Sequence, residues 1–215
     1  MERVKRWILS IVAVTILLLT AGASVVWAQT PAQPIVLKAV TAWTKHWVFN
    51  DLYLEWMKRV NERSGGRLKI EHVGGPEVFP AFEQLDPVKR GVIDSINPPA
   101  AYVTGALPEL HASDLLFDAS DPAKAREIGL FDRLDRITRE KAGVTFLGAT
   151  FWLPFSVYLT KPIEKADLRG FKIRSTPIYD PVLKGLGAAT VSLPPAEVIP
   201  SLQTGVVDGM AWPAI

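Results

Sequence analysis

The sequence predicts an α/β fold with mostly parallel sheets, because short apolar runs typical of strands alternate with amphipathic helical segments. Clusters of Gly and Pro separate these segments, as expected where strands and helices end. The chain has no cysteine, which excludes disulfides, thiol nucleophiles and a lipid attached to cysteine. Stability must therefore come from a hydrophobic core, for which 215 residues are sufficient.

The N-terminal segment, residues 1–28, has the features of an export signal in the expected order. Three basic residues precede an uncharged run from Trp7 to Ala28, with Val26 and Ala28 in A-x-A-like positions. An uncleaved run of this length would instead anchor the chain in a membrane. We expect cleavage near Ala28, a short polar linker at 29–34 and a periplasmic location.

The charge balance gives no reason to expect nucleic acid as a partner. The chain has 24 Lys and Arg against 22 Asp and Glu, a formal net charge of +2. Three of these basic residues and one acid belong to the export signal, so the rest is formally neutral. Most acids lie beside Lys or Arg on polar helix faces, which is typical of a solvated surface.

Residues 35–150 are expected to form a first α/β lobe. It begins with a strand from Ile35, followed by a helix that the glycines at 65–66 end. The apolar stripe expected on that helix is Phe49, Leu52, Trp56 and Val60. The elements expected next are a strand at 67–73, a short helix at 82–91 interrupted by Pro87, a strand at 92–96, a helix at 121–143 and a strand at 144–150.

The helix at 121–143 has the clearest signals of these elements. Asp121 and Pro122 suit its N-cap and first turn, and Gly143 ends it. Its stripe at helical spacing consists of Ala125, Ile128, Phe131, Leu134 and Ile137.

Residues 151–215 are expected to form a second α/β lobe after a crossover near residue 150. A helix there carries Val182, Leu183 and Leu186 and stops at Gly187. Two starts are open: a late one with Asp180 as the cap, or an early one at Thr176 with a kink at Pro181. The other expected elements are strands at 155–160, 171–174, 189–193 and 206–212 and a helix at 195–205.

Common catalytic motifs are absent from the sequence. It has no G-x-S-x-G elbow, no phosphate-binding loop and no H-E-x-x-H pair. The glycines from Gly185 suit the end of a helix better than a dinucleotide site, so no cofactor is expected. His46, His72 and His111 show no metal-ligand spacing.

Arg174 is the sharpest candidate site residue. It ends the strand FKIR, and Ser175, Thr176 and Pro177 after it are typical of the start of a helix. In α/β sheets ligands bind at the carboxyl ends of strands, and guanidinium fits a carboxylate bidentately. The residues alone leave three readings: a solvated charge, an ion-pair partner, or the clamp for an acidic ligand.

Four tryptophans lie at strand ends or in loops, outside the export signal and the predicted helix stripe. Such indoles either cover the edges of a core or line an apolar ligand cleft, and the pattern does not choose between these. They are Trp43, Trp47, Trp152 and Trp212.

The stretch from Asp167 to Pro213 resembles the extracytoplasmic substrate-binding subunits of TRAP (tripartite ATP-independent periplasmic) transporters, the DctP-type family. The similarity lies in the strand DLRGFKIR, the helix end LGA, the PAEV segment and the run LQTGVVDG. Weaker similarity in WMKRVNERSGGRLKIEHVGG and VKRGVIDSINPPAAYVTG extends it over most of the chain.

This resemblance implies a two-lobed periplasmic binding protein fold of type II-like architecture. It implies a receptor, not an enzyme, which closes on a small organic acid and delivers it to the membrane subunits of the transporter. Arg174 matches the carboxylate-binding arginine of the family. Asn97 and Tyr102 are expected to contact the ligand from the opposite lobe.

Departures from the family pattern bear on the ligand. Met210, Ala211 and Trp212 replace the polar run that often follows VDG, and because Ala211 cannot coordinate a cation, no metal is expected. No second arginine accompanies Trp152, which suggests an apolar wall. A keto, hydroxy or aromatic acid therefore fits better than a sugar acid.

Family members normally continue well past VVDG, so the second lobe is expected to be incomplete at Ile215, with unpaired strand edges and poor folding. Rival readings are a secreted or membrane-tethered α/β hydrolase, and a periplasmic binding protein of an ABC transporter or a sensor.

Overall fold

The computed structural model describes the chain over three ranges, residues 33–115, 122–149 and 155–214. The predicted export signal at 1–28 and Trp152 lie outside them. Within these ranges no helix is long and apolar enough to cross a membrane.

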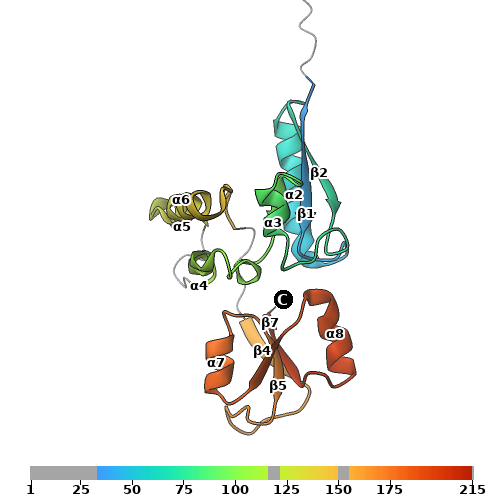
Figure 1. Cartoon of the computed structure of the whole chain (residues 1–215), viewed down its shortest axis with the longest axis vertical. Coiled ribbons are helices and arrows are strands. Elements are labelled where there is room, and N and C mark those ends of the chain that lie inside the picture. The colour runs from blue at the N-terminus through green and yellow to red at the C-terminus, as the bar shows by residue number, and fades with distance from the viewer. Residues whose placement is uncertain (1–32, 116–121, 150–154, 215) are drawn as a thin grey trace, which may run out of the picture. The chain divides into compact units, whose positions relative to one another are not determined.

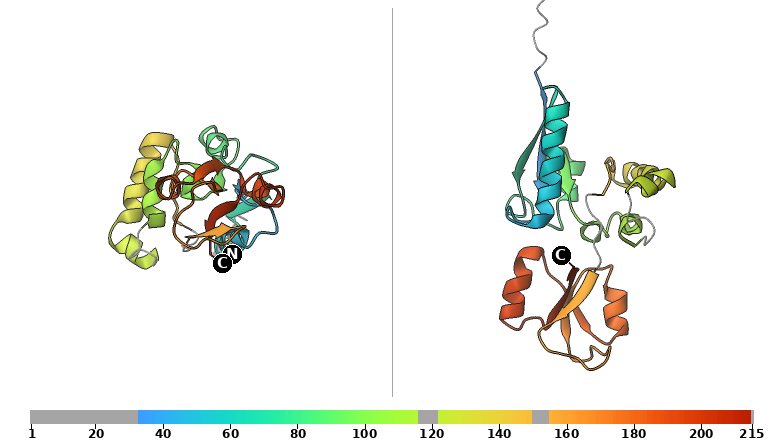
Figure 2. Two further views of the ribbon diagram at one scale, coloured as in Figure 1. Left: turned by 90° about the horizontal axis from the view of Figure 1, so that it is seen from below. Right: turned by 180° about the vertical axis from the view of Figure 1, so that it is seen from behind.

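The first sheet contains three parallel strands in the order β2-β1-β3. Helix α2 connects β1 to β2 and packs against both strands through Tyr53 and Met57, which contact Ala39 and Ile70. Figure 2 shows this helix beside the two strands from behind. The elements are β1 (Ile35–Thr41), α2 (Val48–Arg63), β2 (Leu68–Gly74), α3 (Leu85–Lys89) and β3 (Ser95–Asn97).

The buried face of α2 differs from the predicted stripe. Phe49, Tyr53 and Met57 are buried, whereas Leu52 is 55% exposed. Phe49, Tyr53 and Met57 follow one another at four-residue spacing. Tyr53 can be buried among them because its hydroxyl lies 2.6 Å from the Ser95 hydroxyl and so keeps a hydrogen bond. Of the predicted stripe, Phe49 is buried and Trp56 and Val60 pack against the core while partly buried, so Leu52 is the misplaced member.

The segment between the sheets is mainly helical, and the predicted helix at 121–143 is two helices. Gly129 adopts φ 74°, a left-handed conformation that interrupts the helix, and Ile128 beside it is 55% exposed. The elements are the 3₁₀ helices η1 (Ala100–Tyr102) and η2 (Pro108–His111) and the α-helices α4 (Ala112–Leu115), α5 (Pro122–Glu127) and α6 (Leu130–Ala142).

The strand predicted at 144–150 is not formed in its described part, residues 144–149. No described strand pairs with these residues, so no ladder completes their backbone hydrogen bonds. The Phe146 amide instead donates to the Asp135 carboxylate at 2.9 Å. The predicted lobe boundary near residue 150 lies at the edge of the description, so the division into 35–150 and 151–215 stays a prediction.

The second sheet has the order β4-β7-β5-β6, with β4 antiparallel to β7 and the other pairs parallel. Helices α7 and α8 cover opposite faces of it (Figure 1). The two sheets and their helices confirm the predicted α/β class. The elements are β4 (Phe155–Leu159), β5 (Lys172–Ser175), α7 (Asp180–Gly185), β6 (Ala189–Ser192), α8 (Pro195–Gln203) and β7 (Gly209–Pro213).

Two local details of this sheet follow from single residues. α7 starts late, with Tyr179 as the N-cap and Pro181 within the first turn, where its missing N–H costs nothing. β7 starts at Gly209, three residues later than predicted. A Cβ at Gly209 would lie 2.5 Å from the Tyr158 carbonyl oxygen, so the close approach of β4 requires glycine there.

Candidate functional site

Arg174 is a buried charge at the carboxyl end of β5, with its side chain only 2% exposed. Backbone carbonyls hold its guanidinium. Nε and Nη2 donate to the Leu193 oxygen at 3.0 and 2.9 Å, and Nη1 lies 3.5 Å from the Ala211 oxygen. Nη2 also donates to the Tyr102 hydroxyl oxygen at 3.4 Å. These contacts fix the direction of the planar group.

Burial excludes the reading of Arg174 as a solvated charge. No Asp or Glu in the described ranges forms an ion pair with it, although other charged side chains do pair. A buried cation without an anion costs several kcal/mol in desolvation, about what a close anion would offset. The arrangement therefore suits an anion supplied from outside the protein.

Trp212 lies flat against this charge from the neighbouring strand. The Arg174 Cζ atom is 4.8 Å from the centroid of the Trp212 ring, which is the geometry of a cation–π contact. Alternation along β7 produces it, because Met210 is in register with Arg174 and Trp212 follows two residues later on the same face.

Aromatic residues from the segments that follow β1 and β3 pack around this pair. The Trp43 ring stacks on Trp47 at 5.7 Å and lies edge-on to Trp212 at 6.0 Å. Tyr102 lies 5.8 Å from Trp43. Trp43, Tyr102 and Trp212 are all buried members of one cluster. Five predicted site residues, Arg174 and these four aromatics, therefore come together from segments far apart in the sequence.

Tyr102 can act as a donor in this cluster. Burial raises the pKa of its phenol above the ordinary value, and the nearby Arg174 guanidinium opposes that rise. The phenol is therefore protonated at neutral pH. Because its oxygen accepts from Arg174, its proton is left for another acceptor.

For two further predicted site residues, a place in the cluster stays a prediction. Asn97 ends β3 in register with Thr41, half-buried, and Trp152 lies outside the described residues. Other contributors were missed by sequence reasoning. Phe82 packs edge-on against Tyr102 at 4.6 Å from a segment without regular structure. The Leu193 carbonyl is a backbone group, for which no residue type gives a signal.

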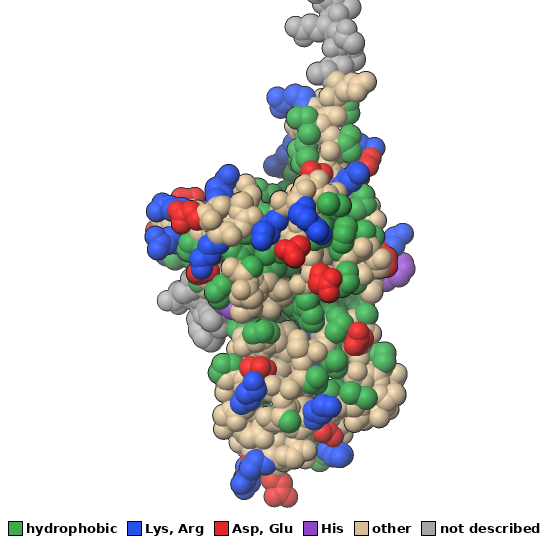
Figure 3. Space-filling view, viewed as in Figure 1, with side chains coloured by type: hydrophobic (Ala, Val, Ile, Leu, Met, Phe, Trp, Pro, Cys, Tyr) green, Lys and Arg blue, Asp and Glu red, His purple; other side chains and the backbone are tan. Residues whose placement is uncertain are grey.

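The described histidines and acids form no group of three or more that could hold a metal. On the face shown in Figure 3, blue and red side chains are interspersed. A shallow hollow of about 360 Å³ lies near the amino end of β5, lined by Asp167, Arg169 and Gly187 among others. There the Arg169 guanidinium lowers the pKa of Asp167 to about 2. The positive charge of Arg169 is therefore already paired with the Asp167 carboxylate.

The family model of bacterial extracellular solute-binding proteins, family 7 (DctP), matches residues 39–215. A solute-binding protein of Albidiferax ferrireducens is 29% identical over 193 residues, covering 86% of this chain and 56% of that protein. A monocarboxylate 2-oxoacid-binding periplasmic protein of Nostoc sp. is 25% identical over 160 residues, covering 72% of this chain and 44% of that protein.

One solved structure with a similar fold is a TRAP solute-binding protein from a marine metagenome, specific for aromatic acid ligands and bound to 3-hydroxybenzoate. It is 26% identical, with a TM-score of 0.66 over 84% of this chain and 58% of that one. The chain thus spans about half the length of the relatives it matches.

Proposed function

Because the chain belongs to the bacterial extracellular solute-binding protein family 7, we propose that it serves as the extracytoplasmic receptor of a TRAP transporter. Its ligand is a small organic acid, whose carboxylate pairs with Arg174. The receptor performs no chemistry on the acid. It delivers the acid to the membrane subunits of the transporter.

The observation that carries this proposal is the buried guanidinium of Arg174 without an acidic partner in the described chain. Its carbonyl contacts orient the group, and the stacked Trp212 covers one face. A carboxylate offers the negative charge that this environment lacks. The 2-oxoacid-binding relative and the aromatic-acid-binding structure support an acid as the ligand.

Closure is the mechanism that fits residues drawn from both predicted lobes. We assign the predicted lobes 35–150 and 151–215 to the two halves of a hinged receptor. Trp43 and Tyr102 then contribute from one half, and Arg174 and Trp212 from the other. The acid stabilises the closed form in proportion to its higher affinity for that form.

A thermal-shift panel tests the proposal on the exported form of the natural gene product. It compares 2-oxobutyrate, picolinate and benzoate with D-glucuronate and with 2-oxobutyramide, the uncharged counterpart of the first acid. An acid present at a hundred times its dissociation constant stabilises the folded protein by about 2.7 kcal/mol. Stabilisation by an acid and none by the amide is expected. Equal stabilisation by both, or none by any acid, would contradict the proposal.

A further inference from the structure

Trp43 has a buried hydrogen-bond donor without a partner. The residue is 3% exposed, and its indole Nε1 has no acceptor within the described protein. Of the indole nitrogens in the described ranges, it alone is both buried and unpartnered. Native proteins satisfy nearly all such groups, because each one left unpaired costs free energy. Two acceptors nearby in the fold, Asn50 Oδ1 and Gln84 Oε1, are likewise buried without a described partner. An acceptor on another molecule would satisfy the indole N–H.

The loop that carries Trp43 is fixed by three buried polar side chains. The Thr41 hydroxyl donates to the Trp43 carbonyl at 3.0 Å, and the Gln84 amide donates to the Thr41 carbonyl at 2.8 Å. The Asn50 amide reaches the carbonyls of Trp43 and Thr44 at 3.4 and 2.7 Å. Thr41 and Asn50 are fully buried and Gln84 is 1% exposed. This network holds the indole in place, so the unpaired N–H belongs to a fixed ring.

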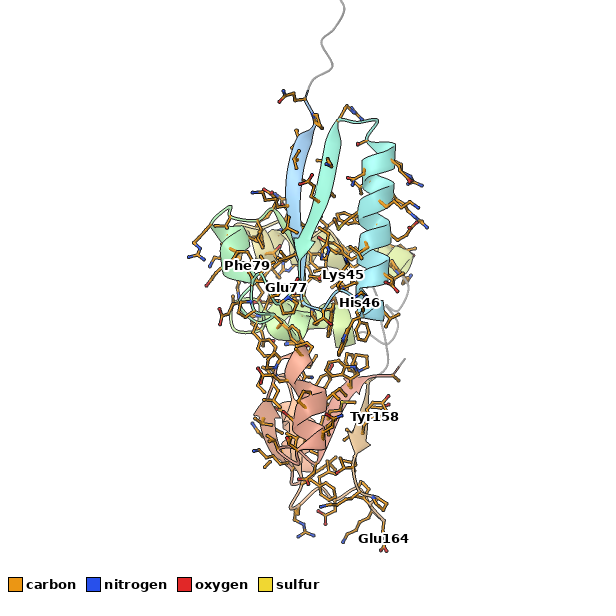
Figure 4. The ribbon with its side chains drawn as sticks, turned by 90° about the vertical axis from the view of Figure 1, so that its right-hand side faces the viewer. Lys45, His46, Glu77, Phe79, Tyr158 and Glu164 are labelled. Atoms are coloured by element: carbon orange, nitrogen blue, oxygen red, sulfur yellow. The ribbon has the colours of Figure 1, made fainter. Side chains whose placement is uncertain are left out.

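The loop that follows β2 packs directly against the backbone of the loop that carries Trp43. A Cβ at Gly75, after β2, would lie 2.5 Å from the Trp43 carbonyl oxygen. Figure 4 shows the two loops side by side, with Lys45 and His46 on the one that follows β1 and Glu77 and Phe79 on the other. Close packing at Gly75 and three hydrogen-bonding side chains thus hold one short loop in place. Among the buried side-chain atoms of the described residues, the Trp43 indole N–H is the donor of this loop that has no partner.

The surroundings of Trp43 restrict the kind of acceptor that fits. Its nearest rings are those of Trp47, Phe49, Tyr102 and Trp212, which form an apolar wall. Trp212 in turn covers Arg174. A ligand in this place meets one cation, aromatic faces and few donors. A planar acid with one further acceptor uses all of these, whereas an acid with many hydroxyls would leave most of them unpaired.

We propose that Trp43 is the specificity-determining residue of the site and that its Nε1–H donates to an acceptor on the bound acid. The site then selects monocarboxylates that carry an oxo oxygen or a ring nitrogen near the carboxylate over acids of the same shape without one. This inference rests on the proposed function, because Arg174 must first hold the carboxylate.

Matched ligand pairs test the role of the N–H directly. Calorimetric titration of the full-length exported protein compares 2-oxobutyrate with butyrate, and picolinate with benzoate. Loss of a hydrogen bond to a buried donor costs about tenfold in affinity or more, so the wild type prefers the first acid of each pair by that factor. Trp43→Phe keeps an aromatic ring and abolishes the preference. Trp56→Phe keeps it, because Trp56 stacks on Tyr53 in a separate cluster.

Two results of the titration would overturn the inference. One is equal affinities of the wild type for both acids of each pair. The other is an undiminished preference in Trp43→Phe, as an equal loss for both acids through packing alone would give. The proposed function fails separately, if none of the four acids binds or if Arg174→Ala binds them unchanged. The indole ¹⁵N–¹H resonance lost in Trp43→Phe gives a second readout. It must shift with 2-oxobutyrate more than with butyrate, and an equal response also overturns the inference.

Discussion

The two faces of the second sheet differ although the same strands build both. On one face Ile173 and Ala211 pack with Leu168 and Leu183, an aliphatic core without a polar atom in its side chains. On the other face the next residues along β5 and β7 are Arg174 and Trp212. One face buries apolar area, which stabilises the fold. The other buries the aromatic ring of Trp212 together with a charge, whose desolvation cost an anion would offset.

Two arginines sharpen this contrast. Arg169, before β5, is exposed, and its guanidinium lies 2.5 Å from the Asp167 carboxylate. Arg174, five residues later, is buried with carbonyls and a phenol as its partners. An exposed pair in solvent contributes little to stability. The difference between these two residues supports our proposal that Arg174, and not Arg169, binds the ligand.

The largest expected effect on stability comes from the aliphatic face. Leu183→Ala should lower the free energy of unfolding by about 2 to 5 kcal/mol, because Leu183 is 1% exposed and leaves a cavity. The affinity for the acid should stay within about twofold, as Leu183 lies on the other face of the sheet. Urea unfolding and calorimetric titration measure the two quantities. A large loss of affinity at full folding would break the distinction between the faces.

A smaller effect is expected at the loop of Trp43. Gly75→Ala places a methyl group against the Trp43 carbonyl, so it should cost about 1 to 3 kcal/mol of stability by overpacking and weaken acid binding by moving the loop. Gly105→Ala is the matched control, because a Cβ there meets nothing within 4 Å. Its stability should change by less than about 0.5 kcal/mol. Equal behaviour of the two variants would remove the argument for a fixed loop.

Local pattern was enough to predict most of the fold. The apolar runs and their Gly or Pro boundaries predicted all the described strands of both sheets, because these are local signals in the sequence. Local pattern failed where contacts with distant segments decide the secondary structure. The stretch 144–149 reads as a strand and finds no described neighbour, and Gly129 breaks a stripe that periodicity alone would continue. The place of Tyr53 in the buried face of α2 was missed because its ring can be buried only where its hydroxyl finds a partner, here Ser95.

The candidate site likewise has features that the sequence predicts and features that only the three-dimensional structure shows. The position of Arg174 at the end of a strand before a turn was visible in the sequence, as were the tryptophans at strand ends. Their convergence was not, since Trp43 and Trp212 meet only through the pairing of the two halves of the chain. The carbonyl of Leu193 and the unpartnered N–H of Trp43 depend on geometry that no residue type encodes.

The affinity of Arg174→Ala and Arg169→Ala for 2-oxobutyrate, measured by calorimetry on the full-length protein, tests the central claim most directly. Loss of the buried guanidinium should cost about 2 to 5 kcal/mol of binding free energy, because the carboxylate loses its partner. Loss of the exposed one should leave the affinity unchanged, since Arg169 pairs only with Asp167 among the described residues. Binding by Arg174→Ala as tight as that of Arg169→Ala would contradict the account.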